Sequence, residues 1–308
     1  MASRSTSATG DATVNPVVAV VGPTAAGKSD LGVALAQALG GEVVNADSMQ
    51  LYRGMDIGTA KLTAAEQQGV PHHLLDVWDV RVTATAAAYQ QLCRDRLAEL
   101  QARGVTPVVV GGSGLYVRAA LDRMEFPGTD PELRQELEAA LTADGPGPLH
   151  QRLRALDPEA AARMEPSNGR RIVRALEVVL LTGRMPGAMT SYEMHVPTVY
   201  VGLDRDDLAE RVATRVDRMW EQGLPAEVAG LAGLRDGVTA SRALGYAQAL
   251  AQLDGRLDER AAKEQTVTAT RRFVRRQRAW FRRDPRVRWL APGAGLLEQA
   301  LRSVGRTD

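Results

Sequence analysis

A loop near the N-terminus combines the residue types that hold phosphate groups. It reads Gly22, Pro23, Thr24, Ala25, Ala26, Gly27, Lys28, Ser29. Its glycines let backbone N–H groups turn inward around phosphate oxygens, the Lys28 ammonium neutralises charge, and the Ser29 hydroxyl is a ligand for Mg²⁺. The loop therefore predicts a site for a diphosphate or triphosphate with Mg²⁺. An ordinary glycine-rich turn is the alternative interpretation.

A second polar segment, Asn45 to Gln50, follows an apolar run that ends at Val43 and Val44. Asp47 lies in this segment, at the expected carboxyl end of a strand. Since a side chain there can face a ligand on the neighbouring phosphate loop, Asp47 is a candidate proton acceptor. A helix N-cap or turn residue is the alternative role.

Arginines crowd a stretch near the C-terminus that also holds Phe273, Trp280 and Phe281. They are Arg271, Arg272, Arg275, Arg276, Arg278, Arg282, Arg283, Arg286 and Arg288. We interpret the stretch as a single helix whose apolar residues pack on the core while its arginines meet the phosphates of a structured nucleic acid. An ion-paired surface helix is the alternative, but nearby acids are few.

The phosphate loop needs a strand before it and a helix after it, and the sequence supplies both. Val17–Val21 is apolar and β-branched, and leucines recur at helical spacing from Leu31 to Leu39. We expect further strands ending at Val44, over 108–110 and over 198–201, with a helix over about 84–103. Alternating strands and helices predict an α/β fold, with a P-loop NTPase-like parallel sheet flanked by helices.

The pattern changes to helices alone over residues 127–194, where prolines mark helix starts or turns. We therefore expect an all-helical insertion domain at 127–194. The α/β core domain would comprise residues 16–126 and 195–308. Residues 1–15 are rich in Ser, Thr and Ala, and we expect a disordered N-terminal tail.

Composition narrows the class of protein further. Hydrophobic residues make up 44% and aromatic residues 4% of the chain, which favours a helix-rich α/β interior filled by Ala, Val and Leu. The formal net charge of +1 conceals the arginine-rich stretch. Cys93 is the single cysteine, so we expect an ordinary core residue in a reducing compartment. No run of about 18 apolar residues occurs, and we expect a cytoplasmic monomer that makes no membrane contact.

Five segments carry a family resemblance. Asn45–Lys61 closely resembles the signature of tRNA dimethylallyltransferases, also called isopentenyl transferases, of the bacterial type. Similar motifs follow in the family's order at His72–Asp76, Gly111–Tyr116, Arg170–Glu177 and Arg242–Tyr246. The resemblance extends from about Val17 to Leu290. Ser29 and Ser113 stand where the family often has threonine, and Gly169 stands where it usually has aspartate.

The resemblance implies transfer of a dimethylallyl group from dimethylallyl diphosphate to the exocyclic N6 amine of the adenosine 3′ of the anticodon in tRNA, with release of pyrophosphate. That amine is a poor nucleophile, so the reaction needs a base, for which Asp47 is the candidate. The phosphate loop would stabilise the leaving pyrophosphate. By resemblance, Thr24 contacts the transferring centre. Arg215 is our candidate for a bidentate pyrophosphate clamp, with a solvated charge on a helix face as the alternative.

The expected partners are tRNA and dimethylallyl diphosphate, and the expected cofactor is Mg²⁺. The candidate tRNA-binding residues are Asp47, Ser48, Met49, Gln50, Ser113, Arg170, Arg171, Arg174, Arg242, Arg271, Arg275 and Arg278. The target adenine would be extruded from the anticodon loop into a closed channel. We favour a structural or RNA-contacting role for His72 and His73, because adjacent side chains point apart on a strand or helix; a metal or acid–base role is the alternative.

Three rival functions use parts of the same pattern. A P-loop small-molecule kinase would use the loop for ATP, but the strand over 107–110 ends in glycines instead of the acidic residue that holds Mg²⁺ in kinases. An adenylate isopentenyltransferase would not need the arginine-rich stretch. A non-catalytic RNA-binding protein would not need both Lys28 and Asp47.

Overall fold

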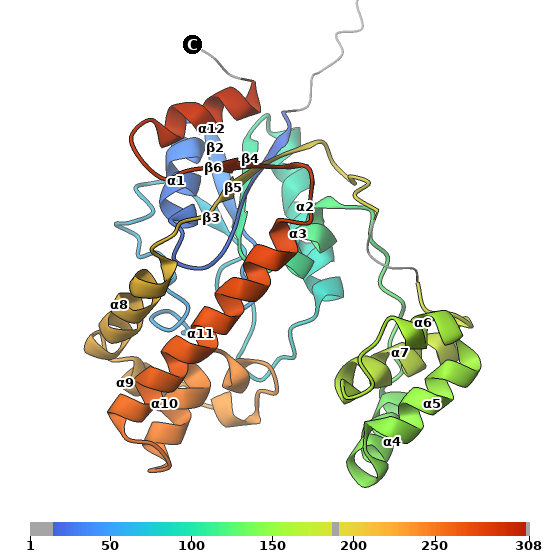
Figure 1. Ribbon diagram of the computed structural model, residues 1–308. Coiled ribbons are helices and arrows are strands. Elements are labelled where there is room, and N and C mark those ends of the chain that lie inside the picture. Colours follow the sequence, from blue (N-terminus) through green and yellow to red (C-terminus); the bar gives the residue numbers. More distant parts are fainter. Residues whose placement is uncertain (1–14, 187–190, 306–308) are drawn as a thin grey trace, which may run out of the picture. The chain divides into compact units, whose positions relative to one another are not determined.

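The computed structural model describes residues 15–186 and 191–305 of the 308-residue chain (Figure 1). The expected N-terminal tail, apart from Asn15, lies outside the described residues. The chain divides into two compact units. The larger comprises Met1–Arg123 and Met194–Asp308, and the smaller comprises Met124–Glu193.

The larger unit is built on a parallel sheet. The described residues form six strands, namely β1 (Val17–Val21), β2 (Gly41–Asn45), β3 (His72–His73), β4 (Thr106–Gly111), β5 (Thr198–Leu203) and β6 (Val287–Leu290). Their order across the sheet is β3-β2-β4-β1-β5-β6, and neighbouring strands pair in parallel. The predicted parallel sheet flanked by helices is confirmed. The short edge strands β3 and β6 were not predicted.

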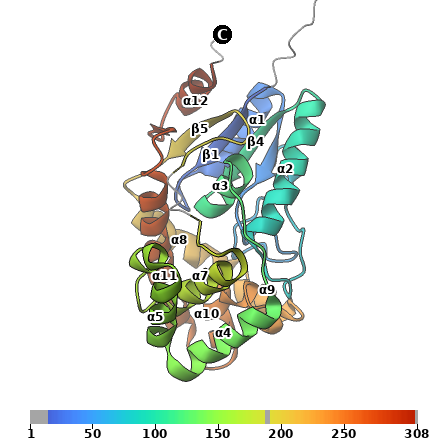
Figure 2. The same cartoon turned by 90° about the vertical axis from the view of Figure 1, so that its right-hand side faces the viewer.

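Helices cover both faces of this sheet (Figures 1 and 2). α1 (Lys28–Leu39) and α12 (Leu296–Val304) pack on the face that carries Val18 and Val20 of β1. α2 (Ala86–Ala102) and α3 (Gly114–Leu121) pack together on the opposite face, against Val17 and Val21. The alternation along β1 is that of a central strand buried on both sides.

A further group of helices packs together beyond the carboxyl ends of the strands. It comprises α8 (Leu208–Glu221), α9 (Leu224–Gly230), α10 (Tyr246–Leu253) and α11 (Glu259–Phe281). Figure 1 shows α11 as a long helix running past α8. Buried side chains of these helices meet Tyr52 and Met55 of the segment after β2 in one hydrophobic cluster. This hydrophobic cluster holds α8 and α11 in place next to the segment after β2.

The arginine-rich stretch is not a single helix, so this prediction was wrong for its second half. α11 ends at Phe281, Arg282 is its C-cap, and Arg288 lies in β6. The physical reason is Pro285, which disfavours helical backbone at the residue before it. Asp284 instead accepts hydrogen bonds from the backbone and guanidinium of Arg286.

Within the described part of residues 124–193, the smaller unit consists of α4 (Pro131–Asp144), α5 (Pro146–Leu156), α6 (Pro158–Ala162) and α7 (Gly169–Thr182). Prolines occupy the first helical positions of three of them, where a missing N–H costs nothing. Leu137, Leu153 and Ile172 centre its hydrophobic core.

No helix in the described part of either unit is long and apolar enough to cross a bilayer.

Candidate active site

The phosphate loop has the strained backbone that its glycines permit. Gly22 has φ +135°, and a Cβ there would lie 2.2 Å from the Leu203 carbonyl oxygen. Gly27 caps α1 with φ +95°. Lys28, the first residue of α1, donates from Nζ to the Pro23 carbonyl at 2.7 Å. The loop thus closes on itself with the Lys28 ammonium inside it.

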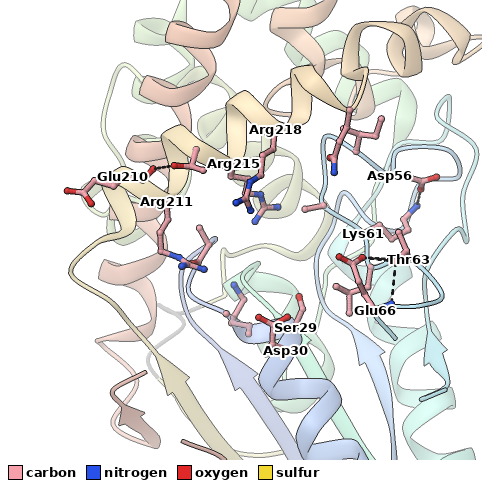
Figure 3. Close-up of a pocket in the computed structure, with 18 residues that line it drawn as sticks. Ser29, Asp30, Asp56, Lys61, Thr63, Glu66, Glu210, Arg211, Arg215 and Arg218 are labelled. Carbon is pink, nitrogen blue, oxygen red and sulfur yellow. Dashed lines mark hydrogen bonds and ion pairs between the residues drawn. The ribbon is translucent and has the colours of Figure 1, made fainter. Parts of the chain in front are cut away.

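A cavity of about 770 Å³ opens beside this loop (Figure 3). Its described lining carries the basic side chains of Lys28, Lys61, Arg211, Arg215 and Arg218. Figure 3 shows the three arginines reaching from α8 toward Ser29 and Asp30 at the start of α1. The carboxylates of Asp30, Asp56, Glu66 and Glu210 also line the cavity, and Asp56 pairs with Lys61. Its positive part is therefore formed by Lys28 and the three arginines at the N-terminus of α1, a place that suits an anion with several charges.

The Lys28 ammonium is electrostatically coupled to the rest of the site. Burial lowers its pKa to about 8, the Asp47 carboxylate opposes this shift, and the Arg215 guanidinium adds to it. Burial likewise lowers the pKa of Arg215, against the attraction of Asp47. A multiply charged anion would stabilise both cations in their charged forms.

Two further cavities adjoin the first. The second, about 70 Å³, is lined by Lys28, Ser29, Thr24, Asp47 and Arg215 among others. The third, about 330 Å³, shares Thr24, Asp47 and Arg215 with the second. Because neighbouring cavities share lining residues, we call the three together the channel; its donor end is the first cavity and its acceptor end is the third. Asp47 and Thr24 lie between the two ends.

Asp47 reaches the channel from a strand that is not next to the phosphate loop. The sequence interpretation placed the two strand ends side by side, but β4 lies between β2 and β1. β4 ends at Gly111, where a Cβ would lie 2.3 Å from the Ala46 carbonyl oxygen. Gly111, the last residue of β4, and Gly112 after it add no side chain here, and Asp47 and Lys28 both line the second cavity.

A local turn fixes the Asp47 carboxylate. Its Oδ1 accepts from the Met49 backbone N–H at 2.9 Å, and its own N–H donates to Asn45 Oδ1 at 2.8 Å. Asp47 is therefore a turn residue, the alternative considered from the sequence, and it also lines the channel. The turn holds the carboxylate in a defined direction.

Arg215 and Thr24 meet across the channel. Arg215 donates from Nη1 to Thr24 Oγ1 at 3.1 Å and from Nη2 to the Thr59 carbonyl at 3.2 Å. Arg215 lines all three cavities. Arg215, the candidate pyrophosphate clamp, and Thr24, the candidate contact to the transferring group, are thus hydrogen-bonded to each other.

The polar residues after Asp47 divide between the two sides of the channel. Ser48 donates from its N–H to Ser113 Oγ at 3.3 Å, and both serines line the acceptor end. Met49 lies beside them in the same lining. Gln50 lines the second cavity, and its Nε2 donates to the carbonyls of Thr59 and Ala60.

The predicted tRNA arginines do not all lie at one place. Arg242 lines the acceptor end, and Arg275 is exposed on α11. Arg271 donates to the Ala209 carbonyl, and Arg278 donates to Asp204 and to the Arg205 carbonyl.

Three further candidates lie on α7 of the smaller unit. Arg170 and Arg171 are exposed. Arg174 donates to the buried carboxylate of Glu177 and to the Pro127 and Gly128 carbonyls, so its guanidinium is engaged within the unit.

The histidines and the cysteine have structural partners. His72 Nδ1 lies 2.8 Å from the Val70 carbonyl, although its ring also borders the second cavity. His73 Nε2 lies 2.6 Å from Glu42. Cys93 is a fully buried core residue, as predicted, and burial raises the pKa of its thiol to about 12. The described residues contain no group of three or more His, Cys, Asp or Glu that could hold a metal ion.

Sequence reasoning missed several residues of the channel. Thr59 and Lys61 lie inside the segment that carried the family resemblance, so their positions could have been proposed from it. Phe273 lines the acceptor end from α11, and Arg276 lies beside it, 5.6 Å over the Phe273 ring. Nothing in the spacing of the arginine-rich stretch distinguished these two residues from their neighbours.

Known proteins resemble this chain over most of its length. Residues 50–284 match the IPP transferase family. A tRNA dimethylallyltransferase of Salinispora arenicola is 62% identical over 94% of this chain and 86% of its own. The crystal structure of a tRNA isopentenylpyrophosphate transferase of Bacillus halodurans is 39% identical, covers 95% of this chain and 100% of its own, and has a TM-score of 0.65. A eukaryotic dimethylallyltransferase acting on tRNA is 26% identical, covers 90% and 74%, and has a TM-score of 0.76.

Proposed function

The chain belongs to the IPP transferase family, and on this premise we propose that it transfers a dimethylallyl group from dimethylallyl diphosphate to a tRNA adenosine. The acceptor is the exocyclic N6 amine of the adenosine 3′ of the anticodon, and pyrophosphate is released. The observation that carries the proposal is that Asp47 lines both the small cavity at the phosphate loop and the third cavity, which has an apolar and aromatic lining.

The donor end suits the leaving group. In the reaction the bond between the allylic carbon and the diphosphate oxygen breaks, and pyrophosphate leaves with the electron pair. The loop N–H groups, Lys28 and the guanidinium of Arg215 would stabilise the charge that grows on the pyrophosphate oxygens. Arg211 and Arg218 extend the same basic surface.

The carboxylate suits the nucleophile. The lone pair of the N6 nitrogen attacks the allylic carbon and forms the new carbon–nitrogen bond, and one N6 proton must leave. Asp47 lines both the second and the third cavity, so it borders the position where donor and acceptor meet. We assign the proton to its carboxylate. Thr24, held by Arg215, would contact the transferring group.

The residues beside the loop fit a Mg²⁺ ion held jointly with the substrate. Ser29 offers one hydroxyl in the lining of both the first and the second cavity. Mg²⁺ in such sites keeps several waters and takes most of its other ligands from substrate phosphates, so a cluster of protein carboxylates is not required. When bound, the ion would neutralise charge on the diphosphate oxygens.

The acceptor end suits an extruded adenine. Its lining combines apolar Met219 and Leu244 with Phe273, on which a base can stack, and with Arg242 and Arg276. We propose that the other candidate arginines of the core, Arg271, Arg275 and Arg278, contribute to the positive surface of α11. We propose that Arg170, Arg171 and Arg174, on α7 of the smaller unit, also bind tRNA. A cytoplasmic, monomeric enzyme without membrane contact completes the proposal.

The two rival enzyme classes are less well supported. The strand β4 next to β1 ends at Gly111 and is followed by Gly112, so its end supplies no acidic residue for a kinase-type Mg²⁺ site. An enzyme that modifies free AMP does not need the extended positive surface that the exposed arginines of α11 form.

One incubation distinguishes these functions. The protein is supplied with radiolabelled dimethylallyl diphosphate, Mg²⁺, and either unmodified tRNA or AMP, and label in each acceptor is counted. We expect label in tRNA at the adenosine 3′ of the anticodon. Label in AMP with none in tRNA would overturn the proposed function.

A further inference from the structure

A buried carboxamide joins the phosphate loop to the helix that lines the acceptor end. Gln277 lies on α11 and is 4% exposed. Its Oε1 accepts from the Thr24 backbone N–H at 2.9 Å, and its Nε2 donates to the Gly112 carbonyl at 2.9 Å. One side chain therefore ties the loops after β1 and β4 to α11.

The chemistry of this position requires both a donor and an acceptor. A carboxamide offers the two on neighbouring atoms, which matches the Thr24 N–H and the Gly112 carbonyl. A carboxylate could not donate to the carbonyl, and an apolar side chain would leave two buried polar groups without a partner. The approach is also close, because a Cβ at Gly112 would lie 2.3 Å from Gln277 Nε2.

The same residue connects Thr24 with the helix that lines the acceptor end of the channel. Thr24 borders the second and third cavities and carries the hydroxyl that receives the Arg215 bond. Phe273 and Arg276, on the same helix as Gln277, line the acceptor end. An adenosine seated there therefore contacts the helix that holds the Thr24 backbone. Gln277 itself is absent from the described lining of the channel.

We propose that Gln277 is a positioning residue for the transfer step. Through its bond to the Thr24 backbone, it holds the Thr24 hydroxyl at the reacting centre. Because Gln277 is part of α11, the position of this hydroxyl is fixed relative to the face of α11 that receives the RNA. This inference rests on the proposed function, because the reacting centre is where tRNA and donor meet. Since Gln277 acts through Thr24 and not on either substrate, its loss lowers kcat and leaves the KM values for both substrates unchanged.

The first test is Gln277→Met, which keeps the side-chain length and removes both hydrogen bonds. We expect kcat for tRNA prenylation to fall about tenfold to hundredfold, because small displacements at a reacting centre have effects of this size. Both KM values should stay within about twofold. The matched control is Gln252→Met, which removes the acceptor of the Trp220 Nε1–H bond outside the channel, and its kcat should stay within about twofold. An unchanged kcat in Gln277→Met overturns the proposal.

A double-mutant cycle tests whether the effect passes through Thr24. In Thr24→Ala, which lacks the hydroxyl, adding Gln277→Met should lower kcat by no more than about twofold. Two losses that simply multiply would contradict a positioning role. If Gln277→Met does not fold, Gln277→Leu takes its place, since it also removes both hydrogen bonds in a side chain that fits the same space, with the same expected loss of kcat.

A second readout needs no substrate. Hydrogen exchange of the Thr24 amide should be faster in Gln277→Met than in the wild type and in Gln252→Met, since its bond is lost. Unchanged protection would overturn the proposal. A wild-type chain that prenylates no tRNA would instead contradict the proposed function, while the exchange result would still decide the role of Gln277.

Discussion

The guanidinium of Arg215 binds the hydroxyl of Thr24 at 3.1 Å, and it does so from α8 across the phosphate loop. Its second hydrogen bond, to the Thr59 carbonyl, fixes the plane of the guanidinium at the junction of the cavities. Arg215 thus connects the leaving-group site with the reacting centre.

Replacing Arg215 by lysine should separate the contribution of its charge to kcat from that of its hydrogen-bond geometry. Arg215→Lys keeps a cation but cannot form two fixed hydrogen bonds, so we expect kcat to fall by about tenfold to hundredfold. Steady-state kinetics with tRNA measure this. The control is Arg235→Lys, whose native partner Asp254 lies outside the channel, and it should keep kcat within about twofold. Equal kcat in the wild type and Arg215→Lys would show that the fork geometry is not used.

The Lys28 ammonium predicts a pH dependence of donor binding. Burial lowers its pKa to about 8, so the free protein loses this positive charge as the pH rises through 8. A diphosphate prefers the charged form, and its affinity should therefore fall up to about tenfold per pH unit above pH 8. Calorimetric titration with dimethylallyl diphosphate from about pH 7 to 9.5 tests this.

Lys28→Arg provides the control for that titration. A guanidinium stays protonated over this range, so the fall in affinity above pH 8 should disappear even if the affinity itself is weaker. An identical pH profile in the two proteins would assign the titration to another group.

Gly22 should resist substitution for two reasons that can be separated. Gly22→Ala forces a Cβ to 2.2 Å from the Leu203 carbonyl at φ +135°, so we expect the free energy of unfolding to drop by more than about 2 kcal/mol. Gly104→Ala, at φ +71° with open space around it, should cost about 1 kcal/mol from backbone strain. Urea unfolding of both variants measures the difference. Equal losses would mean that the close contact with Leu203 has no cost.

Two arginines of α11 should differ in what they support. Arg275 is exposed, so Arg275→Ala should weaken tRNA binding and reduce the slope of log affinity against log salt by about one. Arg278 is held by Asp204, so Arg278→Ala should lower stability as well. Filter binding across a salt series, with Arg96→Ala on α2 as the neutral control, compares them. An unchanged slope in Arg275→Ala would remove it from the RNA surface.

The sequence predicted the parts of the fold that local patterns determine. The strand, loop and helix from Val17 to Leu39 are contiguous, so spacing alone located them. The edge strands β3 and β6 escaped prediction because they are short and form by pairing with β2 and β5. The false extension of α11 past Phe281 came from reading arginine density as helix, although Pro285 was there to end it.

For the candidate site, the sequence could predict which residues take part but not how they are arranged in space. Nothing local could show that β4 separates β2 from β1, since strand order is a tertiary property. Gln277 was missed for the same reason, because its partner Thr24 is 253 positions away in the chain. Residues Ser48 and Ser113, which the family resemblance selected separately, proved to be in contact.

Asp47→Asn tests the account most directly. Asparagine keeps an oxygen that can accept the Met49 N–H, so the turn should survive while the carboxylate is lost. Single-turnover transfer from labelled dimethylallyl diphosphate should slow by about 10²- to 10⁴-fold, with tRNA affinity within about twofold of the wild type. An unchanged rate of transfer would contradict the assignment of Asp47 as the proton acceptor, and with it the proposed working of the channel.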